Sequence, residues 1–233
     1  MARKSQSARS GGDGPRDGKS NRDRIIGAFV ALLGERSFEE IGFGDIAARS
    51  GIALTECRAE FVSTMRVLAA HIEAVDRQVL AGGDADMADE PPRERLFDVL
   101  MRRLELLAPQ RAAVRSLIRS ACRNPTLALA LNGLAVRSQQ WMLTAAGIDS
   151  AGPRGLMRAQ GLALLFADVL RTFVRDEEEG LARTMAALDR ALARGQTWSN
   201  LFDDLCRLVP PMCCPGTRRR APRQEADEEP AAA

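Results

Sequence analysis

Apolar residues recur at helical spacing along most of this 233-residue chain, and this periodicity limits its fold more than any other feature. No segment alternates Val, Ile, Thr or aromatic residues with polar ones, so no strand is expected. Ala, Leu and Arg are abundant, aromatic residues are only 4% and Tyr is absent, a balance that favours helix. The sequence therefore predicts an all-α protein. The first stripe, between residues 21 and 36, consists of Ile25, Ile26, Phe29, Leu32 and Leu33.

Residues 21–80 predict four helices arranged around a glycine turn. After the first helix, a short helix is expected at 43–50, and Gly51 suits the left-handed residue that ends a helix. A short segment, 53–61, follows, and Ser63 is a suitable N-cap for a long helix that continues through Val79. This is the layout of a helix-turn-helix, whose second short helix enters the major groove of DNA.

Polar segments predict the domain boundaries. Residues 1–19 are rich in Gly, Ser and Arg, and we expect a disordered arm, whose positive charge fits a solubilising tail and a phosphate contact equally well. Residues 81–92, rich in Gly, Asp and Pro, separate a helix-turn-helix domain at 20–80 (motif about 43–62) from a larger helical domain at 91–209. Residues 210–233 predict a charged, disordered tail.

The larger domain predicts a series of amphipathic helices. The segment from Leu156 to Val174 is apolar nearly all round, which predicts burial on several sides, with a dimer interface as the simplest explanation. The acidic residues 176–179 are expected to form a solvated start to the next helix, which Arg194-Gly195 would end. A final amphipathic helix would carry Trp198, Leu201, Phe202 and Leu205.

The run NRDRIIGAFVALLGERSFEEIGFGDIAARSGIALTECRAEFVSTMRVLAAHI resembles the N-terminal domain of the TetR regulators. The resemblance implies a homodimer that reads a double-stranded DNA operator and whose larger domain pairs with its twin and binds a small apolar ligand. The matching positions are Ile25-Ile26, Ala28, Phe29, Leu33, Arg36-Ser37-Phe38, Asp45-Ile46-Ala47, Gly51-Ile52, Phe61, Ser63 and Leu68.

The departures from the TetR pattern fall on the expected DNA-reading helix. Ala53 cannot accept the capping hydrogen bond that the usual serine accepts, and Glu56 and Glu60 place acid where phosphate would lie. Two interpretations follow: an operator-binding domain with unusual contacts, or a TetR scaffold that no longer binds DNA. We expect DNA binding, through Arg22, Arg24, Arg49, Ala53, Leu54, Thr55, Arg58, Ser63 and Thr64.

Residues 94–202 also resemble the lipid-binding accessory proteins of ubiquinone biosynthesis, which share the TetR-like fold. That resemblance implies an isoprenoid pocket, a relic helix-turn-helix domain and peripheral membrane contact through the 198–208 helix, although packing on the dimer core is the commoner fate of such a helix. The implied pocket residues are Leu100, Leu117, Leu131, Trp141 and Leu165.

Other classes of function find little support in the residues. One histidine, no Tyr, no G-x-S-x-G and no phosphate-binding glycine loop argue against an enzyme, and we expect neither a cofactor nor a metal site. Five scattered cysteines, no apolar run of membrane-spanning length and a polar start indicate a cytoplasmic protein. The leading hypothesis is a ligand-responsive transcriptional regulator, more specifically a repressor.

Overall fold

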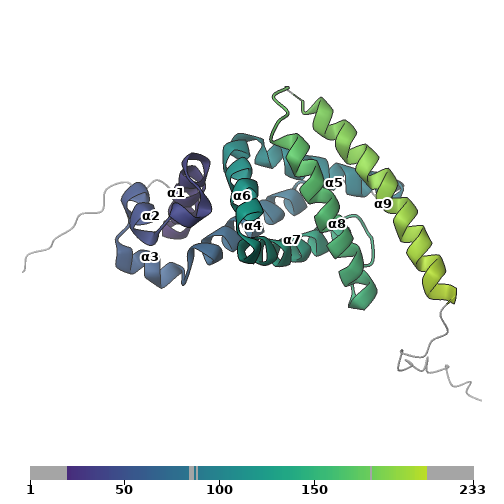
Figure 1. The fold of residues 1–233 in the computed structure, drawn as a ribbon, viewed down its shortest axis with the longest axis horizontal. Coiled ribbons are helices and arrows are strands. Elements are labelled where there is room, and N and C mark those ends of the chain that lie inside the picture. The colour runs from purple at the N-terminus through teal and green to yellow at the C-terminus, as the bar shows by residue number, and fades with distance from the viewer. Residues whose placement is uncertain (1–19, 84–86, 88, 179, 209–233) are drawn as a thin grey trace, which may run out of the picture.

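The computed structural model describes residues 20–83, 87, 89–178 and 180–208, with residues 196–208 described by their backbone alone. The described residues form helices and no strand, which confirms the all-α prediction (Figure 1). In Figure 1 the three short N-terminal helices lie at one end of the molecule and the last helix at the other. The helices are α1 (Asn21–Glu35), α2 (Phe43–Ser50), α3 (Leu54–Glu60), α4 (Thr64–Ala81), α5 (Pro92–Leu107), α6 (Arg111–Arg123), α7 (Pro125–Ala145), α8 (Gly152–Phe173) and α9 (Ala182–Leu208), with 3₁₀ turns η1 (Phe38–Glu40) and η3 (Ala108–Gln110).

The ends of the N-terminal helices are set by local capping. Ser20 caps α1, because its Oγ accepts from the Asp23 backbone N–H at 3.1 Å and the Asp23 carboxylate accepts from the Ser20 backbone at 3.3 Å. Gly51 ends α2 with φ of 66°, a left-handed conformation that costs glycine little. Ser63 caps α4 by accepting from the Arg66 backbone N–H at 3.3 Å. The predicted roles of Gly51 and Ser63 are therefore confirmed.

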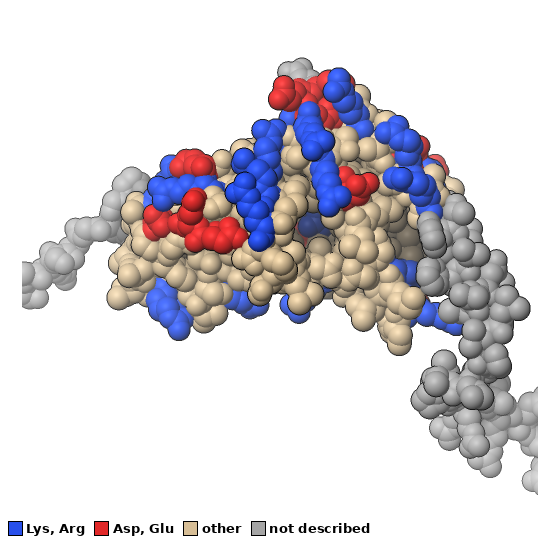
Figure 2. All heavy atoms as spheres, viewed as in Figure 1, with Lys and Arg blue, Asp and Glu red and all other residues tan. Residues whose placement is uncertain are grey.

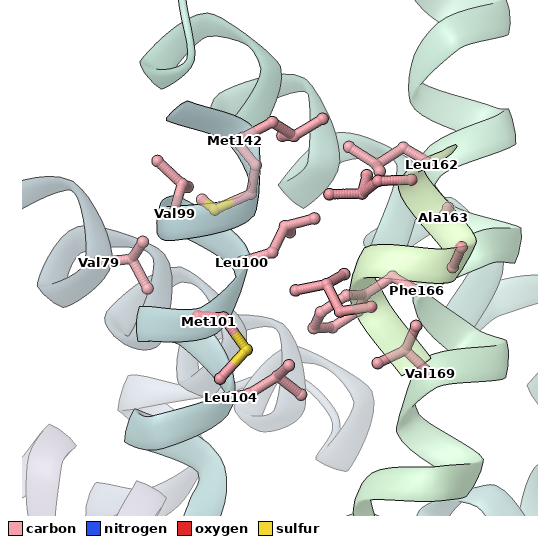
Figure 3. Close-up of a cluster of buried hydrophobic side chains, with 14 of the residues drawn as sticks. Val79, Val99, Leu100, Met101, Leu104, Met142, Leu162, Ala163, Phe166 and Val169 are labelled. Atoms are coloured by element: carbon pink, nitrogen blue, oxygen red, sulfur yellow. The ribbon is translucent and has the colours of Figure 1, made fainter. Parts of the chain in front are cut away.

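Two hydrophobic clusters form the interior. The N-terminal cluster holds α1–α3 together around Phe29, Ile46 and Cys57, none of which is accessible to solvent. The larger C-terminal cluster joins α5, α7, α8 and α9 around Leu100, Met142 and Phe166 (Figure 3). Fully burying one such side chain stabilises the folded state by about 1.5–3 kcal/mol, so these clusters provide the main favourable term in folding.

Helix α4 belongs to both clusters. Its first half contributes Val67 and Leu68 to the N-terminal cluster, and its second half contributes Val75 and Val79 to the C-terminal one. The two cores therefore meet along α4, well before the Gly/Asp/Pro-rich segment at 81–92.

A buried ion pair ties α4 to the C-terminal helices. Asp76 on α4 lies 2.8 Å from the Arg103 guanidinium on α5, and Ser138 on α7 donates to the same Asp76 oxygen at 2.8 Å. Both charged residues are over nine-tenths buried, and burial lowers the pKa of Arg103 despite the favourable charge of Asp76. Buried pairs of this kind contribute little as a pair, but losing one partner is costly.

Two predictions about the last helices are wrong. Helix α9 continues through Gly195 to Leu208, so the expected break at Arg194-Gly195 does not occur. A Cβ at Gly195 would lie 3.1 Å from Leu165 Cδ1, so this glycine allows close packing of α9 on α8. The side chains of Trp198, Leu201, Phe202 and Leu205 lie outside the described residues, as do the predicted arm and tail.

The acidic residues expected at the start of this helix instead precede α9, and they are not simply a solvated face. Asp176 is only 1% exposed and its carboxylate accepts from the Thr184 backbone N–H at 2.8 Å and from the Thr184 hydroxyl at 2.7 Å. Burial acts to raise the pKa of Asp176, but these hydrogen bonds outweigh it and the pKa is lowered. Asp176 therefore fixes the first turn of α9.

Candidate nucleic-acid interface

The exposed face of α3 is the candidate DNA-reading surface. Cys57 points into the N-terminal cluster and fixes the helix, which leaves the opposite face in solvent. Leu54 is 55% exposed, Thr55 and Arg58 are exposed, and Val62, just beyond the helix, is 67% exposed. This face offers two apolar side chains, one hydroxyl and one guanidinium, which are groups suited to the edges of bases in a major groove.

The N-terminus of α3 lacks a side-chain cap, as the sequence predicts for Ala53. Glu56 instead accepts a hydrogen bond from the Ala53 backbone N–H at 3.3 Å, the reverse half of a capping box. Glu56 thus stabilises the start of α3, a role that explains an acidic residue on a helix that the sequence predicts to read DNA.

Glu60 also has an intramolecular partner. Its carboxylate lies 3.6 Å from the Arg22 guanidinium, which in turn lies 4.4 Å from the centre of the Phe61 ring. The negative charge of Glu60 is therefore balanced locally, and Arg22 connects α1 to the end of α3.

Two further predicted phosphate donors also hold the helix-turn-helix together. Arg24 donates to the Ser50 carbonyl at 2.8 Å, which satisfies one of the free carbonyls at the end of α2. Arg49 pairs with Glu35 on α1. The structure thus engages Arg22, Arg24 and Arg49 in intramolecular contacts, and their contacts with DNA stay a prediction.

Arg58 and Arg66 are the cations near α3 that remain available. Both are exposed, and neither pairs with an acidic side chain among the described residues. Arg66 lies in the first turn of α4, beside Ser63 and Thr64, and the sequence-based set of contacts omits it. The signal was present in the sequence, because an arginine in the first turn of a helix opposes the helix dipole and therefore calls for an anionic partner.

Charge is distributed unevenly over the face of the molecule shown in Figure 2. Acidic and basic side chains are interleaved over the end formed by α1–α3, whereas basic side chains form a continuous strip over α6. The α1–α3 end is therefore not a uniformly positive surface, and any affinity for phosphate there depends on a few well-placed groups.

The five residues that the sequence assigned to a ligand pocket are not brought together. Leu100 is fully buried in the C-terminal cluster, whereas Leu117 and Leu131 pack against the N-terminal one. Trp141 is 56% exposed on α7, and Leu165 packs on the C-terminal cluster. The prediction fails because similar Leu/Ala/Arg helices carry little information about which of their faces meet.

Two grooves lie instead where the N-terminal helices meet α6. One, of about 720 Å³, runs between α1, α4 and the start of α6 and is lined by Ile26, Val30 and His71 among others. Burial lowers the pKa of His71, the chain's single histidine, so its imidazole is neutral at pH 7. The other groove, of about 560 Å³, is polar and lies between the α1–α2 turn and α6.

Solved structures of other proteins share this arrangement of helices. The structure of a TetR transcriptional regulator from Nitrosomonas europaea superposes with a TM-score of 0.60 and 27% identity, covering 75% of this chain and 97% of that one. This chain has the fold of the TetR regulators. TetR regulators from Rhodococcus sp. RHA1 (TM-score 0.55, 22% identity, 75% and 95% covered) and Streptomyces coelicolor (0.51, 16%, 81% and 85%) share its fold.

No family model and no curated protein matches the sequence. The resemblance of residues 94–202 to the ubiquinone-biosynthesis accessory proteins gains no support from the comparisons, since these structural neighbours are TetR regulators. Within the described part of the TetR-type chain, no helix combines the length and the apolar character needed to cross a bilayer.

Proposed function

We propose that this TetR-type protein is a transcriptional regulator that binds operator DNA as a homodimer. The observation that carries the proposal is the exposed face of α3, beside the N-terminus of α4. On this face Thr55 and Arg58 are exposed and have no ion-pair or side-chain hydrogen-bond partner among the described residues. The likeness to the Nitrosomonas europaea regulator over 97% of that chain supports it.

The DNA contacts divide by chemistry. Arg58, together with the hydroxyl of Thr55, suits hydrogen bonding to base edges, and exposed Leu54 and Val62 suit contact with thymine methyl groups. Arg66 and the N-terminus of α4, with Ser63 and Thr64, suit a phosphate, because backbone N–H groups at a helix start attract anions. Few phosphates are neutralised, so the affinity should depend only moderately on salt.

The dimer would form through the helices at the opposite end of the molecule. On α8, Leu156, Met157 and Leu164 are 52%, 58% and 61% exposed, and Met185 on α9 is 43% exposed. Solvated apolar side chains that gather on neighbouring helices favour burial against a second copy. Two-fold symmetry would then place two α3 helices about 34 Å, or a multiple of it, apart on a palindrome.

A ligand response would require two arrangements of the helix-turn-helix relative to the dimer. Helix α4 spans both clusters, so a ligand bound more tightly by one arrangement would shift the population of the dimer through it. Repression fits this scheme if the free protein holds the DNA-competent arrangement.

Arg66 and Arg77 provide a matched test. Both are exposed on α4, three turns apart on one face, but only Arg66 lies at the end next to α3. Arg66→Ala should weaken operator binding about tenfold and reduce the salt slope by about two in the dimer, since each protomer loses one phosphate contact. Arg77→Ala should change neither, and fluorescence anisotropy with a labelled operator measures both.

Equal effects of the two substitutions would show that only general charge matters and would remove α4 from the interface. Arg58→Ala should also weaken binding, and it should relax preference at one base position, which a set of single-base operator variants detects. Unchanged affinity and preference would take Arg58 out of the DNA-reading face.

A further inference from the structure

The turn between α1 and α2 is bound directly to α6 by two serines. Ser116 donates its hydroxyl to the Arg36 carbonyl at 2.6 Å, and Ser120 accepts from the Phe38 backbone N–H at 3.1 Å. The serines are 4% and 3% exposed and lie four residues apart, hence on one face of α6. We refer to Ser116 and Ser120 as the α6 serine pair.

The α6 serine pair supplies hydrogen-bond partners to two partly buried backbone groups of the α1–α2 turn. The Arg36 carbonyl and the Phe38 N–H lie between helices, and a buried polar backbone group without a hydrogen bond is costly. An apolar side chain at either position would fill the space but leave the group unpaired. The hydroxyls therefore define where the turn can rest on α6.

Neighbouring contacts extend this connection along α6. Asn124, at the end of α6, donates to the Glu39 carboxylate at 3.3 Å. A backbone hydrogen bond, with further help from Ser120, Asn124 and the charge of Arg123, lowers the pKa of Glu39. At the start of α6, a Cβ on Gly34 would meet Ala112 Cβ at 3.6 Å, so α1 and α6 are in close contact.

The opposite side of α6 is fixed to the C-terminal helices. The Arg115 guanidinium donates to the Val174 carbonyl, and the Arg111 guanidinium lies 5.2 Å from the centre of the Phe173 ring. Helix α6 thus connects the helix-turn-helix to the end of α8 by a route that does not include α4. In Figure 1, α6 lies between α1 and the C-terminal helices.

We propose that Ser116 and Ser120 are positioning residues that set the orientation of the helix-turn-helix on the C-terminal domain, and thereby the operator half-site spacing that the dimer accepts. The inference rests on the proposed function, because spacing has meaning only for a DNA-binding dimer. A change of one base pair moves a half-site by about 3.4 Å and rotates it by about 34°, so small changes in orientation should alter the preferred spacing.

The test variant is Ser116→Ala/Ser120→Ala. Alanine is a better helix former than serine, so α6 itself should persist. The matched control is Cys122→Ala, an exposed position on the same helix. An operator is first obtained by selection with the wild type. Each protein is then titrated against duplexes that carry its two half-sites at the selected spacing, or at spacings one or two base pairs longer or shorter. A duplex with a single half-site is titrated in the same way.

We expect the wild type and Cys122→Ala to prefer the selected spacing at least tenfold, and the double variant to bind all spacings within about threefold. Single half-site affinity should stay within about twofold, because α3 is unchanged. A double variant that keeps the wild-type spacing preference overturns the inference, as does one that loses affinity for the single half-site to the same extent as for the full operator.

A second readout needs no DNA. Hydrogen exchange of the Phe38 amide, which donates to Ser120, should be at least tenfold faster in the double variant than in Cys122→Ala. An exchange rate of the Phe38 amide that is the same in both variants would show that the Ser120 hydroxyl does not hold the turn. If the wild type binds no duplex at all, the proposed function fails, and the exchange result still decides whether the serine pair holds the turn.

Discussion

Replacing Asp76 by asparagine should leave a buried, uncompensated positive charge in the C-terminal core. Arg103 is 7% exposed, its guanidinium lies 2.8 Å from Asp76, and its Nε has no hydrogen-bond partner among the described residues. Arginine does not lose its proton under ordinary conditions, so the charge must stay buried or the core must open to water.

The expected cost follows from this geometry. Removing one partner of a buried ion pair lowers the free energy of unfolding by about 3–5 kcal/mol. For a chain of 150–250 residues, 1 kcal/mol corresponds to about 2–4 °C in Tm, so we expect Tm to fall by about 6–20 °C. The loss should exceed that of a typical surface substitution, which stays within about 0.5 kcal/mol.

Chemical denaturation at one fixed protein concentration measures the effect, since dimerisation would add a concentration dependence. The double variant Asp76→Leu/Arg103→Met serves as the control, because replacing both charges by apolar groups is often neutral or stabilising. A single variant that costs less than about 1 kcal/mol, or a double variant that costs more than the single one, would refute this account of the pair.

Three residues give further predictions about stability. The lowered pKa of Asp176 means that its hydrogen bonds to Thr184 contribute stability that is complete above its unfolded pKa and is lost as the pH falls through the lower folded value. Urea unfolding at a series of pH values from 7 to 3 measures this effect. At pH 7 the wild type should have a larger free energy of unfolding than Asp176→Asn, and the difference should shrink below about pH 4. A difference that stays constant over this range would contradict the prediction. Gly51→Ala should lower the free energy of unfolding by about 1–2 kcal/mol, because φ of 66° is left-handed, whereas Gly44→Ala inside α2, where a Cβ meets nothing, should stabilise slightly. Thermal unfolding of both variants measures these effects. A Gly51→Ala variant as stable as the wild type would show that the turn can relax.

Local signals in the sequence were sufficient for the boundaries of the N-terminal helices. The bounds of α2, the left-handed Gly51 and the Ser63 cap depend on neighbours within a few residues, which the sequence displays directly. The continuity of α9 depends instead on a residue distant in the sequence, because Gly195 packs closely against Leu165 on α8.

The candidate site could be predicted only in outline. The sequence places Arg58, Ser63 and Thr64 near α3, but it cannot show that Arg24 is used by the Ser50 carbonyl or that Glu60 is balanced by Arg22. Those pairings join residues 26 and 38 positions apart, and only the folded chain decides them. The same reason explains the scattered pocket residues, whose helices looked alike in sequence.

The central claim is that this TetR-type protein reads DNA sequence, and a titration of the wild type against its own upstream DNA and a scrambled duplex tests it most directly. At two salt concentrations, we expect tight binding to the upstream DNA and at least hundredfold weaker binding to the scrambled duplex, with the preference retained at the higher salt. Weak binding to both duplexes that disappears together at higher salt would contradict the claim.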